Sequence, residues 1–182
     1  MALYNLALVL HTQGGARLFE AEEVFQQALR GQDTLLGSDH RSTLKTKTSL
    51  ALCLQSLGKL DEAGALFEEA LAAQKESLGS NHLDTLHSMA SMANLLKQKM
   101  ERLDEAEVLL RKVVAGREAQ LGPENASTVS AVDALSGILY ERGKVEEAVA
   151  LGKWLLYMKD ELQSPKKSGQ RPALPLHTKP EA

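Results

Sequence analysis

The chain carries two regularly spaced histidines, and histidine is the side chain best suited to acid–base chemistry and metal binding near neutral pH. His40 and His82 lie 42 residues apart, and an acidic or amide residue precedes each of them. A metal site needs three or four ligands that converge in space, whereas these two histidines fall at the starts of successive predicted helices. A structural role before each helix is therefore favoured over a metal site, and neither a metal nor a cofactor is predicted.

Cys53 is the only cysteine, and it lies within the apolar stretch 50–54. A nucleophilic cysteine needs a neighbouring base and a lowered pKa. The sequence indicates neither, so a buried core position is favoured. A single cysteine also excludes an intramolecular disulfide, which favours a reducing compartment.

Acidic residues gather in three runs, at 20–23, 68–69 and 146–147, which all fall on predicted helices. Catalysis by carboxylates needs two of them facing each other across a pocket, and nothing in the spacing suggests this. These carboxylates are expected to complement helix dipoles and to keep the surface soluble. Since the sequence also lacks a phosphate loop and a nucleophile elbow, an enzyme is not predicted.

The composition of the chain narrows the class of protein further. Its 182 residues are 43% hydrophobic and carry a net charge of −3, which is typical of one globular domain and gives no basic surface for nucleic acid. No stretch approaches the ~18 apolar residues of a membrane span, and the apolar start lacks the positive lead of a secretion signal. We therefore expect a cytoplasmic protein with no nucleic-acid partner and no membrane partner.

The elements that must position these residues repeat along the chain. Ala21, Ala63, Ala106 and Ala148 each follow a glutamate within an amphipathic stretch, and they lie 42, 43 and 42 residues apart. Self-similarity at a fixed period of this size is the signature of a solenoid of stacked helical hairpins. The predicted fold is all-α, a superhelix of about four hairpins.

The predicted repeat domain covers residues 1–162 and is followed by a tail, 163–182, that contains proline and lysine. The four repeats span about 2–36, 39–78, 81–121 and 124–162. The first repeat begins inside its first helix, so the chain is either part of a longer protein or carries a shortened first repeat. The tail holds four of the five prolines and no helical period, so disorder is expected there.

Glycines and short polar residues mark the expected helix boundaries. A helix is expected over about 18–35, with Gly37 closing it in the left-handed conformation. Ser38 and Asp39 are expected to cap the next helix by accepting its free amide hydrogens. In the third repeat the usual turn glycine is missing, so the helix before that turn is expected to run slightly long.

The second repeat carries the fullest copy of a motif. The motif consists of Ala51 in the first helix, Gly58 at the turn, then Asp61-Glu62-Ala63, Phe67 and Ala70-Leu71. This pattern resembles the tetratricopeptide repeat (TPR), whose common form is shorter. The 42-residue period is similar to that of the kinesin light chain subfamily. So is the link Leu-Gly-x-[Asp/Asn]-His-x-x-Thr at 36–43 and 78–85, which has a weaker copy at 121–128.

The resemblance implies a right-handed superhelix whose first helices line a concave groove that holds an extended peptide. It implies a non-enzymatic adaptor or scaffold for protein–protein interaction, with kinesin light chain-like cargo binding as its specific form. The groove residues that it implies are Asn5, His11, Lys45, Thr48, Leu52, His87, Asn94, Lys97, Gln98, Asp133 and Tyr140, with Leu8, Gln55 and Glu141 beside them.

A structural role in assembly is the alternative function. Because the first repeat begins inside a helix, its hairpin is expected to expose Leu3, Leu6, Leu10 and Phe19. This edge would stack on another copy of the chain or on the rest of a larger protein.

Two further features have both a plain and a functional interpretation. Trp154 and Tyr157 are expected to cover the end of the core, with a docking patch as the alternative. Pro172-Ala173-Leu174-Pro175 has the spacing of a ligand for aromatic-groove domains, but a plain tail is favoured.

Overall fold

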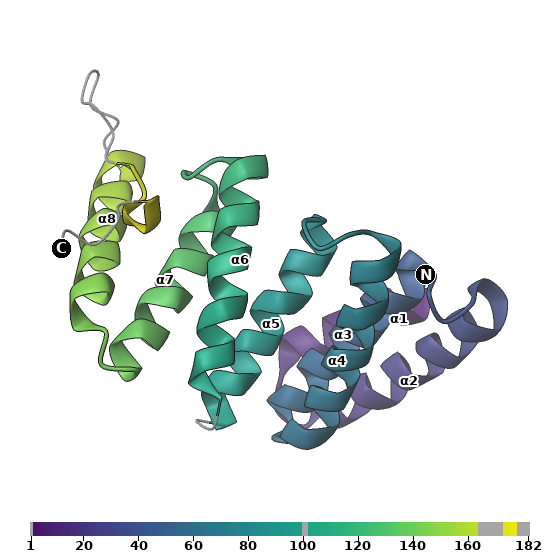
Figure 1. The fold of residues 1–182 in the computed structure, drawn as a ribbon. Helices are drawn as coiled ribbons and strands as arrows, with labels where there is room; N and C mark the ends of the chain where they lie inside the picture. The colour runs from purple at the N-terminus through teal and green to yellow at the C-terminus, as the bar shows by residue number, and fades with distance from the viewer. Residues whose placement is uncertain (1, 100–101, 164–172, 178–182) are drawn as a thin grey trace. The chain divides into compact units, whose positions relative to one another are not determined.

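The computed structural model describes residues 2–99, 102–163 and 173–177. Within these residues the chain forms eight α-helices, one short 3-10 helix and no strand, which confirms the predicted all-α fold (Figure 1). α5 is one residue longer than α3 and α7, as expected where the turn glycine is missing. The elements are α1 (Ala2–Gln13), α2 (Arg17–Leu36), α3 (Arg41–Ser56), α4 (Leu60–Ser77), α5 (Leu83–Lys99), α6 (Leu103–Leu121), α7 (Ala126–Glu141), α8 (Val145–Gln163) and the 3-10 helix η1 (Pro175–His177).

The helices group into two compact units. The first unit lies within residues 1–99 and holds α1 to α5, whereas the second lies within 100–182 and holds α6, α7, α8 and η1. In the first unit α1 packs on α2, α2 on α3, α3 on α4 and α4 on α5. In the second unit α6 packs on α7 and α7 on α8. Within each unit every helix therefore packs on the next one in sequence, as in a row of stacked hairpins.

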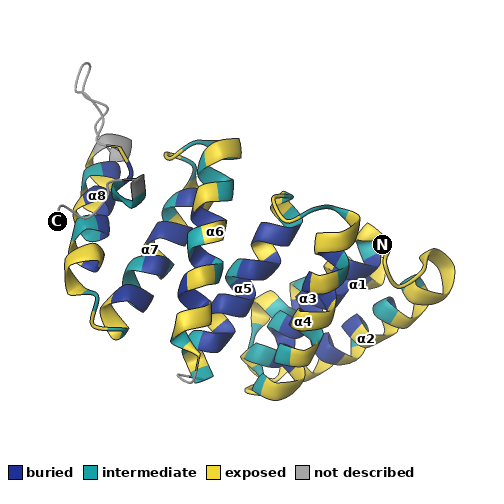
Figure 2. Ribbon diagram, in the orientation of Figure 1, coloured by how far each residue is buried: buried dark blue, intermediate teal, exposed yellow. Residues whose placement is uncertain are grey.

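Alanines and aromatic rings form the core at the contacts between helices. Ala21, Ala63 and Ala106, which define the period, are fully buried, and so are Phe25 and Phe67. Each ring lies four residues after an alanine and therefore on the same helix face. Figure 2 shows the resulting stripes of buried and exposed residues along the helices. The small alanines let the helix backbones approach closely, while the rings fill the space beside them.

The link between α2 and α3 begins at Gly37, which has φ 91° and ψ 160°. The positive φ was expected, but the ψ angle is extended, so the predicted left-handed helical closure is wrong. The Gly37 amide still donates to the carbonyl of Asp33, and its own carbonyl accepts from Thr43 Oγ1 at 2.8 Å. An extended backbone with positive φ is strained for any residue with a Cβ, so glycine is required here.

Histidine, and not the preceding residues, caps the helix that follows each of the first two links. His40 Nδ1 accepts from the amide of Ser42 at 3.1 Å, and His82 Nδ1 accepts from the amide of Asp84 at 3.1 Å. Asn125 Oδ1 does the same at the start of α7. Capping by Ser38 and Asp39 was therefore a wrong prediction. The structural role predicted for both histidines is confirmed, because each satisfies a backbone donor that no carbonyl inside the helix can reach.

Two glutamates at equivalent positions of the repeat are buried and paired. Glu22 accepts from Lys59 Nζ at 2.7 and 2.9 Å. Glu107 accepts from Lys144 Nζ at 2.9 Å and also from Arg111 and Arg142. Glu22 belongs to an acidic run that was expected to lie at the surface, and for this residue the expectation is wrong. Each carboxylate instead joins a second helix to the turn of the following hairpin.

The last described segment packs on α8. Leu174 is buried, and η1 contacts α8, so residues 173–177 are ordered within the predicted tail (Figure 1). Trp154 is buried, as expected of a core residue, while Tyr157 is half-buried. Gln163, where the predicted tail begins, is the last residue of α8. The other tail residues, including Pro172 of the proline motif, lie outside the described residues.

We expect Phe67→Ala to lower the free energy of unfolding by about 3–5 kcal/mol, because it removes a fully buried ring and leaves a cavity. Phe19→Ala is the matched control, since Phe19 is 61% exposed, and it should change stability by less than ~0.5 kcal/mol. Urea denaturation followed by circular dichroism measures both. Equal effects of the two substitutions would contradict the assignment of Phe67 to the core.

We expect His40→Ala to lower the free energy of unfolding by about 0.5–2 kcal/mol, the usual cost of losing a helix cap. His40→Asn should retain most of the stability, because Asn125 shows that an amide oxygen accepts the same bond. The comparison uses urea denaturation of the two variants beside the unsubstituted chain. If Asn proves as harmful as Ala, the cap is not what His40 contributes.

Candidate functional site

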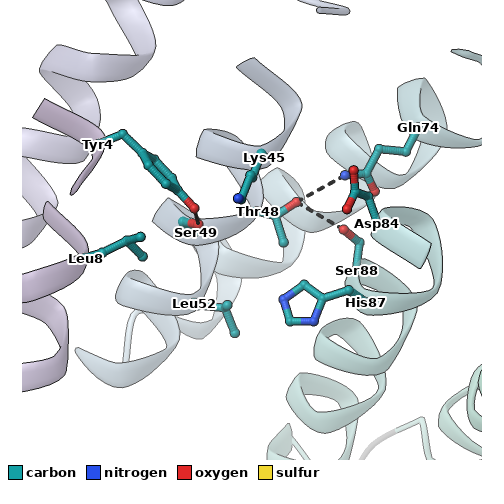
Figure 3. A pocket seen from close by; sticks show the side chains of 10 residues that line it. All are labelled: Tyr4, Leu8, Lys45, Thr48, Ser49, Leu52, Gln74, Asp84, His87 and Ser88. Carbon is teal, nitrogen blue, oxygen red and sulfur yellow. Dashed lines mark hydrogen bonds between the residues drawn. The ribbon is translucent and has the colours of Figure 1, made fainter. Parts of the chain in front are cut away.

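A pocket of about 210 Å³ lies in the first unit, among the first helices of its hairpins (Figure 3). α1, α3 and α5 supply nine of its ten lining residues, and α4 supplies one. The lining residues are Tyr4, Leu8, Lys45, Thr48, Ser49, Leu52, Gln74, Asp84, His87 and Ser88. The first helices can meet here because their opposite faces are packed on second helices.

Side-chain hydrogen bonds hold neighbouring first helices together at and beside this pocket. The Tyr4 hydroxyl and Ser49 Oγ lie 3.2 Å apart and join α1 to α3. Thr48 Oγ1 and Ser88 Oγ lie 3.0 Å apart and join α3 to α5 (Figure 3). Beside the pocket, Gln55 Nε2 donates to Gln98 Oε1 at 3.0 Å. The partners are 40 to 45 residues apart in sequence, close to one period, so the repeat itself brings them together.

One of the residues that line the pocket, Gln74, carries a buried acceptor. Gln74 reaches in from α4, and its Nε2 donates a long hydrogen bond of 3.5 Å to Thr48 Oγ1. Its Oε1 is buried and has no hydrogen-bond partner among the described residues. A buried carbonyl oxygen without a partner costs about 1–3 kcal/mol, so a donor that reached it would recover that energy.

Two charged groups of opposite sign line the pocket, Lys45 and Asp84. Lys45 Nζ sits 5.4 Å from the centre of the Tyr4 ring, within the range of a cation–π contact. Asp84 accepts from Arg41 Nε at 2.7 Å. Partial burial pushes the pKa of Asp84 upward, but the hydrogen bond and charge of Arg41, together with the charges of His82 and Lys45, outweigh burial and hold the pKa below its ordinary value. Asp84 is therefore a carboxylate near neutral pH, and the pocket carries both signs of charge.

The structure places four of the predicted groove residues together in this pocket: Lys45, Thr48, Leu52 and His87. Leu8 lines it as well. Other predicted residues of the first unit lie on the same helices outside it: exposed Asn5 on α1, and exposed Asn94 and Gln98 and half-buried Lys97 on α5. His11 on α1 is half-buried and bonded to Ser56, and burial lowers its pKa. Asp133 and Tyr140 are exposed on α7 of the second unit.

Sequence reasoning missed five lining residues: Tyr4, Ser49, Gln74, Asp84 and Ser88. Tyr4 lies four residues before Leu8, Ser49 lies three before Leu52, and Asp84 lies three before His87. Ser88 lies four residues after Asp84, so a stricter helical projection finds all four. Gln74 gives no such signal, because it belongs to a second helix and occupies an otherwise apolar face.

Other candidate chemistry is not supported by the described residues. No group of three or more His, Cys, Asp or Glu side chains among them is arranged to hold a metal ion. Cys53 is buried and donates weakly to the Leu18 carbonyl at 3.4 Å. Burial first, and then the charge of Glu22, raise the pKa of its thiol to about 11. In the part of the chain that the structure covers, no helix is both long and apolar enough to cross a membrane.

The comparison with known families agrees with the repeat geometry. The profile described as Tetratricopeptide repeat matches residues 1–63 and 42–118, which together make up more than half of the chain. The chain belongs to the tetratricopeptide repeat family. No curated protein sequence matches this TPR protein.

Solved structures are similar to this TPR protein over most of its length. The crystal structure of Podosopora anserina putative kinesin light chain nearly identical TPR-like repeats is 28% identical, with a TM-score of 0.79 over 91% of this chain and 76% of that chain. A crystal structure of a substituted variant of such repeats is 22% identical, with a TM-score of 0.60 over 89% of this chain and 95% of that chain. BtubC (BKLC) from P. vanneervenii is 19% identical, with a TM-score of 0.74 over 86% of this chain and 62% of that chain. The last two share the fold alone.

We expect the Cys53 thiol of this TPR protein to be unreactive in the native state. With a pKa of about 11, roughly one thiol in a thousand is ionised at pH 8, compared with about a quarter for a free cysteine. Ellman's reagent should therefore react at least a hundredfold more slowly with the folded chain than with the chain in urea. Equal rates would show that Cys53 is accessible and ionised, and would reopen the nucleophile interpretation.

Proposed function

We propose that this TPR protein is a non-enzymatic adaptor that binds an extended segment of a partner protein along α1, α3 and α5. The pocket among these helices carries the proposal, because it combines apolar walls with a buried acceptor that lacks a donor. Ligand sites of proteins have this composition, mostly apolar with a few well-placed polar groups.

The proposed mechanism begins with one partner side chain entering the pocket. Its apolar body contacts Leu8 and Leu52, and a donor at its tip reaches Gln74 Oε1. Burial of an apolar side chain contributes about 1.5–3 kcal/mol, and satisfying the acceptor adds to it. Because hydrogen bonds between neighbouring first helices already fix the surface, little ordering energy is lost on binding.

The rest of the partner segment lies along the polar face of the first helices. Asn94, Lys97 and Gln98 on α5 are the proposed donors to its backbone, and Asn5 and His11 on α1 are proposed contacts on the other side of the pocket. Asp133 and Tyr140, on α7 of the second unit, are proposed as partner contacts of that unit by itself.

Cargo binding is the specific form of this proposal, because the repeats resemble those of a putative kinesin light chain. A cytoplasmic location is proposed with it, since the single cysteine is consistent with a reducing compartment. The fold and the family support an interaction module, and the identity of the cargo is left to experiment.

Peptides selected from a random display library on the immobilised chain should bind through the pocket. Leu52→Asp should weaken each selected peptide about tenfold or more, because it places a charge on the apolar wall. Asn94→Ala combined with Lys97→Ala should weaken the same peptides without unfolding the chain. Fluorescence anisotropy measures the dissociation constants, and circular dichroism checks the fold.

Phe19→Asp is the matched control for Leu52→Asp. It places the same carboxylate on an exposed apolar residue outside the pocket. The equivalent positions of the next two repeats, on α4 and α6, already carry Asp61 and Asp104. Peptide affinity should be unchanged in this variant. Peptides that bind all variants with equal affinity, or that lose affinity equally in the control, would show that the pocket is not the binding site.

A further inference from the structure

In each first helix, three residues spaced i, i+3, i+6 lie on one face of the helix. We call these three residues its stacking stripe. The stripes of α3, α5 and α7 are buried. They consist of Lys47, Leu50 and Cys53 in α3, of Met89, Met92 and Leu95 in α5, and of Val132, Leu135 and Ile138 in α7. Lys47 stays buried because its ammonium group is paired with Glu69.

A second helix of the preceding hairpin contacts each of these stripes in the first unit. Cys53 Sγ contacts the carbonyl of Leu18 on α2 at 3.4 Å. Leu95 of α5 lies against Gly64 of α4. A Cβ added to Gly64 would be 3.4 Å from Leu95 Cδ2. In the second unit α6, also a second helix, packs on α7. The same type of contact thus recurs within both units.

The corresponding stripe of α1 is open. It consists of Leu3, Leu6 and Val9, which are 43%, 48% and 53% exposed. Leu10, which the sequence placed on this edge, is buried instead. Phe19 is exposed but lies outside the stripe. Because α1 has no acidic residue and no lysine or arginine, nothing on this helix opposes a second apolar surface.

On α8, the face that would pack on the stacking stripe of a following first helix is exposed. Val145 and Val149 stand at the positions of Leu60 and Gly64, two repeats further on, and Leu156 stands at the position of Leu71. All three α8 residues are exposed, Leu156 by 65%. Gly152 lies between them, and a Cβ added there meets nothing within 4 Å, so a partner side chain has room to enter.

We infer that copies of this chain associate head to tail, with α8 of one copy packing on the stacking stripe of α1 of the next. The occupant of each open face is a second copy, because the chain supplies both halves of a contact that it already makes internally. Both faces are apolar and exposed, so packing one against the other removes apolar surface from water. The contact is heterologous, so it joins further copies instead of closing after two.

The inference is tested by sedimentation velocity of the full chain from low micromolar to millimolar concentration. The unsubstituted chain should form species larger than a dimer as concentration rises. Leu6→Glu should block the α1 face, and Leu156→Glu should block the α8 face. Each variant alone should be monomeric, with association at least tenfold weaker. Circular dichroism checks that the variants are folded. Folding is expected because Leu6 and Leu156 are exposed, so a charge at either position is not buried.

The decisive experiment mixes the two blocked variants. Each retains one open face, so an equimolar mixture should form a 1:1 dimer that does not grow. Val108→Glu is the control, because it alters an exposed residue outside both stripes at the position where α2 carries Glu23. It should associate like the unsubstituted chain.

Three results would overturn the inference. The first is an unsubstituted chain that stays monomeric at every concentration. The second is continued association of the Leu156→Glu variant, which would indicate α1 pairing with α1. The third is a mixture of the blocked variants that forms no dimer. None of these outcomes bears on the pocket, so this inference and the proposed adaptor function fail separately.

Discussion

Every hairpin of this protein has more apolar surface than its own two helices can bury, and this excess is the constraint on which the structure depends. The stacking stripes of α3 and α5 are buried, and α2 and α4 of the preceding hairpins contact them at Cys53 and Leu95. Contact between helix backbones requires small residues, which is why Ala21, Ala63 and Ala106 recur with the period. The period of the sequence is therefore the spacing of this one contact.

Stacking uses the apolar faces and leaves a polar face on the first helices. There the side chains bond across one period, as Tyr4 does to Ser49 and Thr48 to Ser88, so the surface is preformed. The same packing holds Gln74 behind the first helices with its carbonyl oxygen unpaired among the described residues. A preformed polar surface of this kind is well suited to binding a partner, because little ordering is needed on association.

Part of the site could be predicted from sequence because it follows the period. Thr48, Leu52 and His87 belong to first helices, and helical spacing places them on one face. Gln74 could not be found in this way, because its role depends on a neighbouring helix. Glu22 was misplaced at the surface, since a run of acidic residues does not reveal that Lys59 lies against one of them. In the same manner Ser38, Asp39 and His40 are all suitable caps by type, and only the backbone angles select His40.

The sequence by itself determined the repeat, the helices and the family, because periodic burial leaves a pattern in one dimension that needs no knowledge of distant contacts. Helix ends followed from glycine and from breaks in that pattern. Tertiary structure decided which apolar stripes are covered and which, on α1 and α8, stay open. It also decided which buried charges are paired and where an acceptor lacks a donor. These outcomes depend on residues about one period apart meeting within a few ångströms, and only the packing of one hairpin on the next sets those distances.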